Sequence, residues 1–234
     1  MQKLAFVAAA LSAAACTRTE SSDILTSGIY ASIGANANGD GTTTVSAQLL
    51  LGDPSNLNFV DLTGDDRLIA SFEGQDKVMT ESILLNIVTH TTSFQSDEAD
   101  DEFIVDFQRT VDPGAPSSII TLPPPFEIAA PAASSSRAQA MTLTWSPSSP
   151  DDTMRWSLSG DCIELAGATI SGDTGTLGLP SGTIVKRAGA NVPDSCTVVL
   201  QLHRTRVGLV DTHFGRGGTA TGEQTRQVTF TTTP

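Results

Sequence analysis

The stretch MRWSLSGDC, residues 154–162, alternates apolar and polar side chains. Because successive side chains of a β-strand point to opposite faces of a sheet, Met154, Trp156 and Leu158 are predicted to share one buried face. Continuing the alternation places Cys162 on that face as well. The pattern therefore predicts a half-buried β-strand followed by a core cysteine.

A second stretch, CTVVLQLHR at residues 196–204, repeats this alternation. The apolar residues that share the parity of Cys196 are Val198, Leu200 and Leu202. Both stretches thus direct a sulfur atom toward one core. His203 has the opposite parity, so we expect its side chain to face outward.

Similar alternation recurs along the rest of the chain, which is rich in Thr and Val, two residues that suit half-buried strands. The further alternating stretches are residues 29–33, 45–51, 103–107, 141–145 and 228–231. Polar turns such as NANGDG (36–41) separate them, and the glycine-rich GLVDTHFGRGG (208–218) is predicted to be the loop between the last two strands. TESILLNIVTH (80–90) is short and contains Ile, Val and Thr, which favours strand over helix. These features predict an all-β fold.

The proline-rich stretch LPPPFEIAAPAASSSRA, residues 122–138, predicts a domain boundary, because three consecutive prolines form a stiff, extended spacer. The strands after it resemble those of immunoglobulin-like and fibronectin-III-like domains, with Trp156 in the place of the core tryptophan. The chain departs from the immunoglobulin pattern, in which the cysteines lie on the second and sixth strands, because Cys162 ends the third expected strand. We therefore expect two tandem immunoglobulin-like β-sandwich domains. The expected segments are a signal peptide at 1–15, a tether at 16–23, an acidic sandwich at 24–118, a Pro/Ser-rich linker and first strand at 119–136, and a disulfide-bridged sandwich at 126–234.

The first fifteen residues have the three-part layout of a secretory signal peptide. A short charged start, Met1–Lys3, precedes the apolar run Leu4–Leu11 and the small residues Ser12–Ala15. The apolar run is far shorter than the roughly 18–20 residues that span a bilayer as a helix. The sequence therefore predicts export.

The residues Ala13-Ala14-Ala15-Cys16 resemble the lipobox of bacterial lipoproteins. That resemblance implies cleavage before Cys16 and lipid attachment to its thiol, although the family usually has Leu where Ala13 stands. Thr17 in place of Asp is compatible with sorting to the outer membrane. The alternative is an ordinary signal peptide cut after Ala13 or Ala15, with an incidental thiol at Cys16. The whole chain resembles a group of exported bacterial lipoproteins of uncharacterised function.

Export also bears on the other two cysteines, because disulfides form and persist in oxidising compartments. We expect a Cys162–Cys196 disulfide, which closes a loop of about 35 residues and stabilises the fold by roughly 4 kcal/mol on the chain-entropy model. The alternative is two reduced, buried thiols. Two cysteines without a further Cys or a nearby His pair do not provide a tetrahedral zinc site.

The charge of −13 lies almost entirely in the first half of the chain. Residues 23–118 contain 16 acidic and 3 basic residues, whereas residues 119–234 contain 9 acidic and 8 basic ones. The acidic half argues against nucleic-acid binding, which needs a basic surface. It also argues against adhesion to anionic lipid by charge.

The acidic stretch SDEADDEF, residues 96–103, offers the candidate metal ligands Asp97, Asp100 and Asp101. A calcium ion would relieve the repulsion among these carboxylates, and the alternative is a solvated acidic loop without cofactor. The sequence contains no G-x-S-x-G, H-E-x-x-H or P-loop motif, and we expect no enzymatic activity.

The sequence thus predicts a non-enzymatic interaction or structural module of the bacterial cell envelope. The lipid would hold it at a membrane, in the periplasm or on the cell surface, and a protein or glycan would be its partner. The alternative function is a calcium- or carbohydrate-binding module that uses loops at the ends of the sandwiches.

Overall fold

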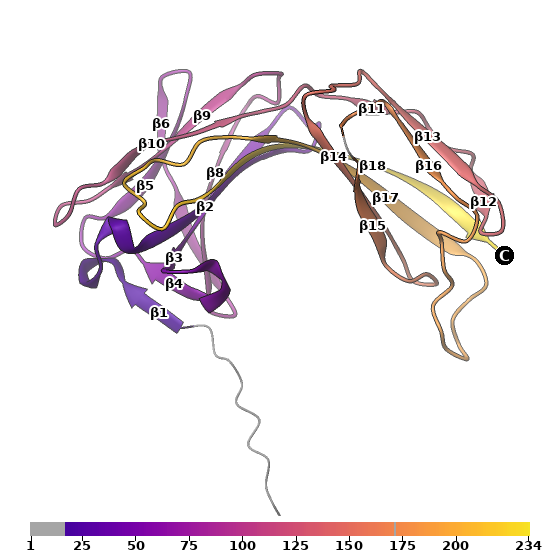
Figure 1. The fold of residues 1–234 in the computed structure, drawn as a ribbon, viewed down its shortest axis with the longest axis horizontal. Coiled ribbons are helices and arrows are strands. Elements are labelled where there is room, and N and C mark those ends of the chain that lie inside the picture. The colour runs from indigo at the N-terminus through magenta and orange to yellow at the C-terminus, as the bar shows by residue number, and fades with distance from the viewer. Residues whose placement is uncertain (1–16, 171) are drawn as a thin grey trace, which may run out of the picture.

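The computed structural model of the protein describes residues 17–170 and 172–234 (Figure 1). Its fold is all-β and sandwich-like, which confirms the predicted class. The other elements that it contains are three single-turn 3₁₀ helices, at Ser21–Asp23, Thr26–Gly28 and Pro54–Asn56. The strand prediction for residues 80–90 is also confirmed, since this stretch forms most of a hairpin.

One long sheet runs through the whole molecule. Its strands, in spatial order, are β1 (Thr17–Glu20), β4 (Asn58–Asp61), β3 (Thr43–Leu51), β2 (Ile29–Ala37), β18 (Gly218–Thr233), β17 (Cys196–Val207), β14 (Thr153–Gly160) and β15 (Ala166–Ile170). Strands β8 (Ile87–Phe94) and β7 (Thr80–Leu84) extend it beside β3, and β12 (Ser134–Ser136) pairs with the end of β18. Figure 1 shows an arch with this sheet along its concave side.

Two smaller sheets form the outer layer of the arch (Figure 1). The first contains β10 (Ala115–Thr121), β9 (Glu102–Gln108), β5 (Arg67–Phe72) and β6 (Gln75–Val78). The second contains β11 (Glu127–Ile128), β13 (Met141–Ser146) and β16 (Thr176–Leu179). Each covers one end of the long sheet, so the described residues form two large hydrophobic cores, beside a small cluster of Leu50, Phe59 and Val88.

The first core lies between β2, β3 and the four-stranded sheet. The alternation of β2 is visible in its burial, because every second residue from Ile29 to Ala37 is buried. Phenylalanine rings face these small residues from the opposite layer, and the rings of Phe72 and Phe103 stack at 4.8 Å between centroids. Phe214 and Ala220, from the C-terminal part of the chain, also belong to this core.

The second core lies between the three-stranded sheet and β14, β17 and β18. Its largest members are the aromatic residues Phe126, Trp145, Trp156 and Phe230. Val198, Leu200 and Leu202 are fully buried here, as their alternation predicted.

We call the layers around the first core the first part of the molecule and the layers around the second core the second part. Strand β18 belongs to both parts. Its first residues pair with β2 from Gly218↔Ala31 to Gln224↔Ala37, and its last residues pair with β12. Along nearly its whole length it pairs antiparallel with β17, and the predicted glycine-rich loop joins the two. The end of β10 crosses this hairpin so closely that a Cβ at Gly222 would lie 2.1 Å from the carbonyl oxygen of Thr121. Glycine is therefore required at this crossing.

Candidate interaction surface

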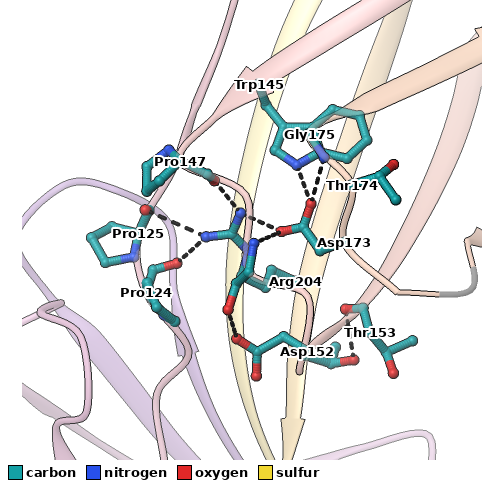
Figure 2. A network of polar contacts seen from close by, with 12 residues as sticks. Pro124, Pro125, Trp145, Pro147, Asp152, Thr153, Asp173, Thr174, Gly175 and Arg204 are labelled. Carbon is teal, nitrogen blue, oxygen red and sulfur yellow. Dashed lines mark hydrogen bonds and ion pairs between the residues drawn. The ribbon is translucent and has the colours of Figure 1, made fainter.

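A buried arginine lies where the two parts of the molecule meet (Figure 2). Arg204 on β17 and Asp173 in the β15–β16 loop both have side chains with no exposed surface, and they form an ion pair. The carboxylate of Asp173 also accepts a hydrogen bond from the indole nitrogen of Trp145 at 2.5 Å and one from the backbone N–H of Gly175 at 3.1 Å. Buried charges need such partners, because an unpaired one is costly in a medium of low dielectric constant.

The two terminal nitrogens of Arg204 also reach backbone carbonyl groups, whereas its Nε has no hydrogen-bond partner. Its Nη1 donates to the oxygen of Pro124 at 2.6 Å, and its Nη2 donates to the oxygen of Pro147 at 2.5 Å. The guanidinium also lies 4.7 Å from the centre of the Phe126 ring, a cation–π distance. Burial lowers the pKa of Arg204, and the charge of Asp173 opposes that shift. The proline-rich linker is thus fixed against β17 and the β13–β14 loop.

Arg206, two residues further along β17, joins the two parts a second time. It donates two hydrogen bonds to the carboxylate of Asp152, at 2.8 and 3.1 Å, and one to Asp100 at 2.6 Å. Its Nη1 also reaches the carbonyl oxygen of Leu122 at 3.2 Å. The hydrogen bond to Asp152 is the main reason why the pKa of Arg206 is raised. Two neighbouring arginines therefore hold the parts in a defined arrangement.

On the concave side of this junction, polar side chains from adjacent strands converge on Glu223 of β18. Its Oε1 accepts a hydrogen bond from Asn36 Nδ2 of β2 at 2.8 Å and from Thr225 Oγ1 at 3.0 Å, and lies 2.9 Å from His203 Nδ1 of β17. Arg155 of β14 lies 3.8 Å from its other oxygen. Burial raises the pKa of Glu223, but the bond to His203 and the other contacts outweigh it, so the pKa is lowered overall.

This cluster is the centre of a larger polar face. The odd-numbered positions of β17 and β18 point away from both cores, because the even-numbered positions supply the core residues. Further polar residues on the same face are Ser32, Ser46, Gln48, Gln201, Thr205 and Gln227. We call these residues, together with Asn36, Arg155, His203, Glu223 and Thr225, the concave face. It offers hydrogen-bond donors and acceptors on a continuous sheet that crosses both parts.

The structure places the predicted site residues in different ways. Cys16 lies outside the described residues. Cys162 and Cys196 form the expected disulfide in the second core, with a Cα–Cα distance of 5.8 Å. His203 lies on the outward face, as predicted, but its side chain is only 14% exposed because of its contacts with Glu223 and Thr225.

The three candidate calcium ligands each bind a different protein group. Asp97 accepts a hydrogen bond from the backbone of Gly41 at 3.1 Å, and Asp101 accepts one from Ser96 Oγ at 2.6 Å. Asp100 forms the ion pair with Arg206. Within the described ranges, no group of three or more His, Cys, Asp or Glu side chains is placed to hold a metal ion.

Sequence reasoning did not identify Arg204, Asp173 or Arg206. The sequence did contain a signal for Arg204. This residue continues the alternation of Cys196, Val198, Leu200 and Leu202 and therefore falls on the core side of the strand. Asp173 lies in a turn-rich loop, SGDTG, where an aspartate is ordinary. Its burial depends on contacts with distant segments, and no local pattern reports those.

No protein-family model matches the chain, and no curated protein matches it significantly. In the part of the chain that the structure describes, no helix is both long enough and apolar enough to cross a membrane.

Proposed function

We propose that the protein is an exported bacterial lipoprotein that acts, without catalysis, as an interaction module of the cell envelope. Lipid attached to Cys16 would hold it at a membrane, with the outer membrane as the expected site, and the concave face would bind the partner. Within this proposal, the two layered parts are immunoglobulin-like sandwiches.

The observation that carries the proposal is the continuity of the concave face across both parts. Strands from the two parts of the molecule, β2 and β14, contribute to one polar cluster around Glu223. Arg204 and Arg206 fix the parts behind it, so the face is already formed before a partner arrives. A preformed surface loses less conformational entropy on binding than a surface that must first be ordered.

The face also suits a partner with hydrogen-bonding groups better than an apolar one, because its side chains are mainly Ser, Thr, Asn, Gln and one His–Glu pair. An extended polypeptide or another polar macromolecular surface has the required chemistry. The lack of a charge excess at this face would make binding only weakly dependent on salt.

The binding proposal is tested by photo-cross-linking in cells. A photoreactive residue replaces Gln201 or Gln227 on the concave face, and a matched control replaces Gln75 on the outer strand β6. We expect discrete cross-linked species from Gln201 and Gln227 that Gln75 does not give, and Glu223→Lys should reduce them. Equal cross-linking from all three positions would contradict the proposal.

The anchoring proposal is tested by the intact mass of the protein from its native membrane. We expect the mass of residues 16–234 plus acyl chains, with release into the soluble fraction after Cys16→Ser. A native chain that retains residues 1–15, or that is cut elsewhere without added lipid, contradicts it.

A further inference from the structure

The hairpin between β7 and β8 ends in a group of exposed aliphatic side chains. Ile83, Leu84, Leu85 and Ile87 are 45%, 71%, 83% and 39% exposed. Isolated exposed apolar residues are normal on protein surfaces, whereas four gathered at one projecting tip mark a surface that is covered by something else. We call these four residues the apolar tip.

The backbone at the tip is unusual as well. Leu84 pairs with Ile87, and the two residues between them, Leu85 and Asn86, have φ angles of +51° and +65°. Such two-residue hairpin turns favour Asn-Gly, because residues other than Gly, Asn and Asp are strained in the left-handed backbone region. A leucine is thus placed at the most projecting position although the turn itself disfavours it.

The apolar tip lies at the same end of the molecule as the first described residues. Thr17 pairs with Asn58 at the start of β4, and the next residue, Phe59, is buried against Val88 of β8 and Leu50 of β3. Val88 in turn pairs with Ile83 of the tip. In Figure 1, β1 and β4 lie at the lower end of the first part, where the chain leaves the described region. Leu57, 49% exposed, adds a further aliphatic side chain next to Asn58.

We propose that the apolar tip inserts into the interfacial region of the lipid surface at which Cys16 would hold the protein, an inference that rests on the proposed anchoring. Thr17, the residue that follows Cys16 in the sequence, lies at this end of the molecule, so a membrane that holds Cys16 is within reach of the tip. Insertion orients the first part of the molecule, with the end that carries β1 and β4 toward the membrane (Figure 1).

Insertion would be driven by apolar burial and not by charge. Between Met79 and Thr89 the chain has one charged residue, Glu81, and no Lys or Arg. Residues 23–118 as a whole are strongly acidic. An uncharged or zwitterionic surface is therefore preferred to an anionic one, the reverse of what a basic amphipathic segment shows. Four aliphatic side chains alone give weak, reversible binding, which a second attachment at Cys16 makes persistent.

The test supplies the anchor chemically. The chain from Cys16 onward is coupled through the Cys16 thiol to maleimide lipid in phosphatidylcholine vesicles, since Cys162 and Cys196 are bonded to each other. Leu85→Trp reports insertion at the tip, and Val78→Trp, at an aliphatic residue that is 60% exposed on β6, is the matched control. We expect a blue-shifted emission and quenching by brominated acyl chains for Leu85→Trp only. Absence of both effects at position 85 overturns the proposal.

A second arm uses the uncoupled protein and measures partitioning to the same vesicles. Leu84→Ser/Leu85→Ser should weaken partitioning by roughly 100-fold, about tenfold for each leucine removed from lipid contact. Replacing half of the lipid by phosphatidylglycerol should weaken it too, with recovery at high salt. If the tip instead joins two copies of the chain, the uncoupled protein sediments as a dimer that the double substitution dissociates, which overturns the lipid proposal. Because coupling to Cys16 is chemical, these results stand whether or not the native mass shows lipidation.

Discussion

The two cores of the molecule are packed by different means. The first contains seven buried alanines, at positions 31, 35, 37, 47, 70, 115 and 220, and faces them with phenylalanine rings. In the second, no alanine is fully buried among the described residues, and two tryptophans and a disulfide take their place. The first core is thus held by the fit of small residues against large rings, and the second by large side chains together with a covalent bond.

This difference shows how one long sheet can serve two layers of unequal composition. Strand β18 contributes Ala220 to the first core and Phe230 to the second. Because the strand is continuous, the two cores are linked, and the contacts at the junction set how far disruption of one core reaches the other. The buried pair Arg204–Asp173 and the contacts of Arg206 lie at that junction, so they decide whether the molecule unfolds in one step or in two.

The largest effect is expected from Arg204→Met. The substitution leaves the carboxylate of Asp173 buried without its ion-pair partner and frees the carbonyl groups of Pro124 and Pro147. Removing one partner of a buried ion pair typically costs about 3–5 kcal/mol, and we expect the upper end here. In urea unfolding followed by Trp fluorescence and circular dichroism, the transition should move to lower urea, and the two probes should no longer coincide.

A matched double variant separates charge burial from packing. Arg204→Met/Asp173→Asn keeps an acceptor for Trp145 and Gly175 but removes the unpaired charge. It should recover part of the lost free energy of unfolding. If the double variant is no more stable than Arg204→Met, the buried charge of Asp173 is not the cause.

The next effect comes from the covalent bond of the second core. Cys162→Ala/Cys196→Ala should lower the free energy of unfolding by about 4 kcal/mol, since the disulfide restricts the unfolded chain over a loop of about 35 residues. Hydrogen exchange should rise mainly in β14 and β17 and far less in β2 and β3. Equal acceleration in both regions would show that the two cores behave as one cooperative unit.

Most features of the second core could be predicted from the sequence. The alternation around Met154 and Cys196 identified the strands, their buried faces and the disulfide, because large apolar residues at every second position leave one interpretation. The first core was harder to read. In β2 the buried residues include Ala31, Ala35 and Ala37, and alanine carries little periodic signal.

The participation of the C-terminal segment in the first core could not be predicted from local pattern. Phe214 stacks on Phe107 at 6.0 Å, and β18 pairs with β2 in parallel, nearly two hundred residues away in sequence. Parallel pairing between distant strands depends on the global topology, and no turn sequence specifies it. The cluster around Glu223 was missed for the same reason, since its members come from four strands. The proposed anchor at Cys16 stays a prediction.

A smaller effect should distinguish the packing of the first core. Ala47→Leu introduces three carbon atoms at a fully buried position of β3, opposite a layer that is already filled by rings. Overpacking of this kind costs about 1–3 kcal/mol. The control Ser46→Leu changes the neighbouring position on the other face, which is only half-buried, and should cost clearly less. Urea unfolding measures the free energy of unfolding of both variants. Equal losses would mean that packing against the phenylalanine rings does not require the alanines.

The smallest effect concerns pH and again distinguishes the two cores. Asp211 precedes Phe214 in the loop that packs on the first core, and its carboxylate accepts hydrogen bonds from Ser117 and His213. Burial raises the pKa of this carboxyl, but the hydrogen bonds outweigh it and lower the pKa to about 2. Because the folded pKa is lower than the unfolded one, the stabilisation is complete above about pH 4 and is lost as the pH falls toward 2.

Asp211→Asn should cost about 1–2 kcal/mol at neutral pH and remove that part of the acid sensitivity. Asp151→Asn, at an exposed position in the second part, is the control and should leave the loss of stability at low pH unchanged. If Asp211→Asn loses as much free energy of unfolding at low pH as the wild type does, the acid sensitivity comes from other carboxylates.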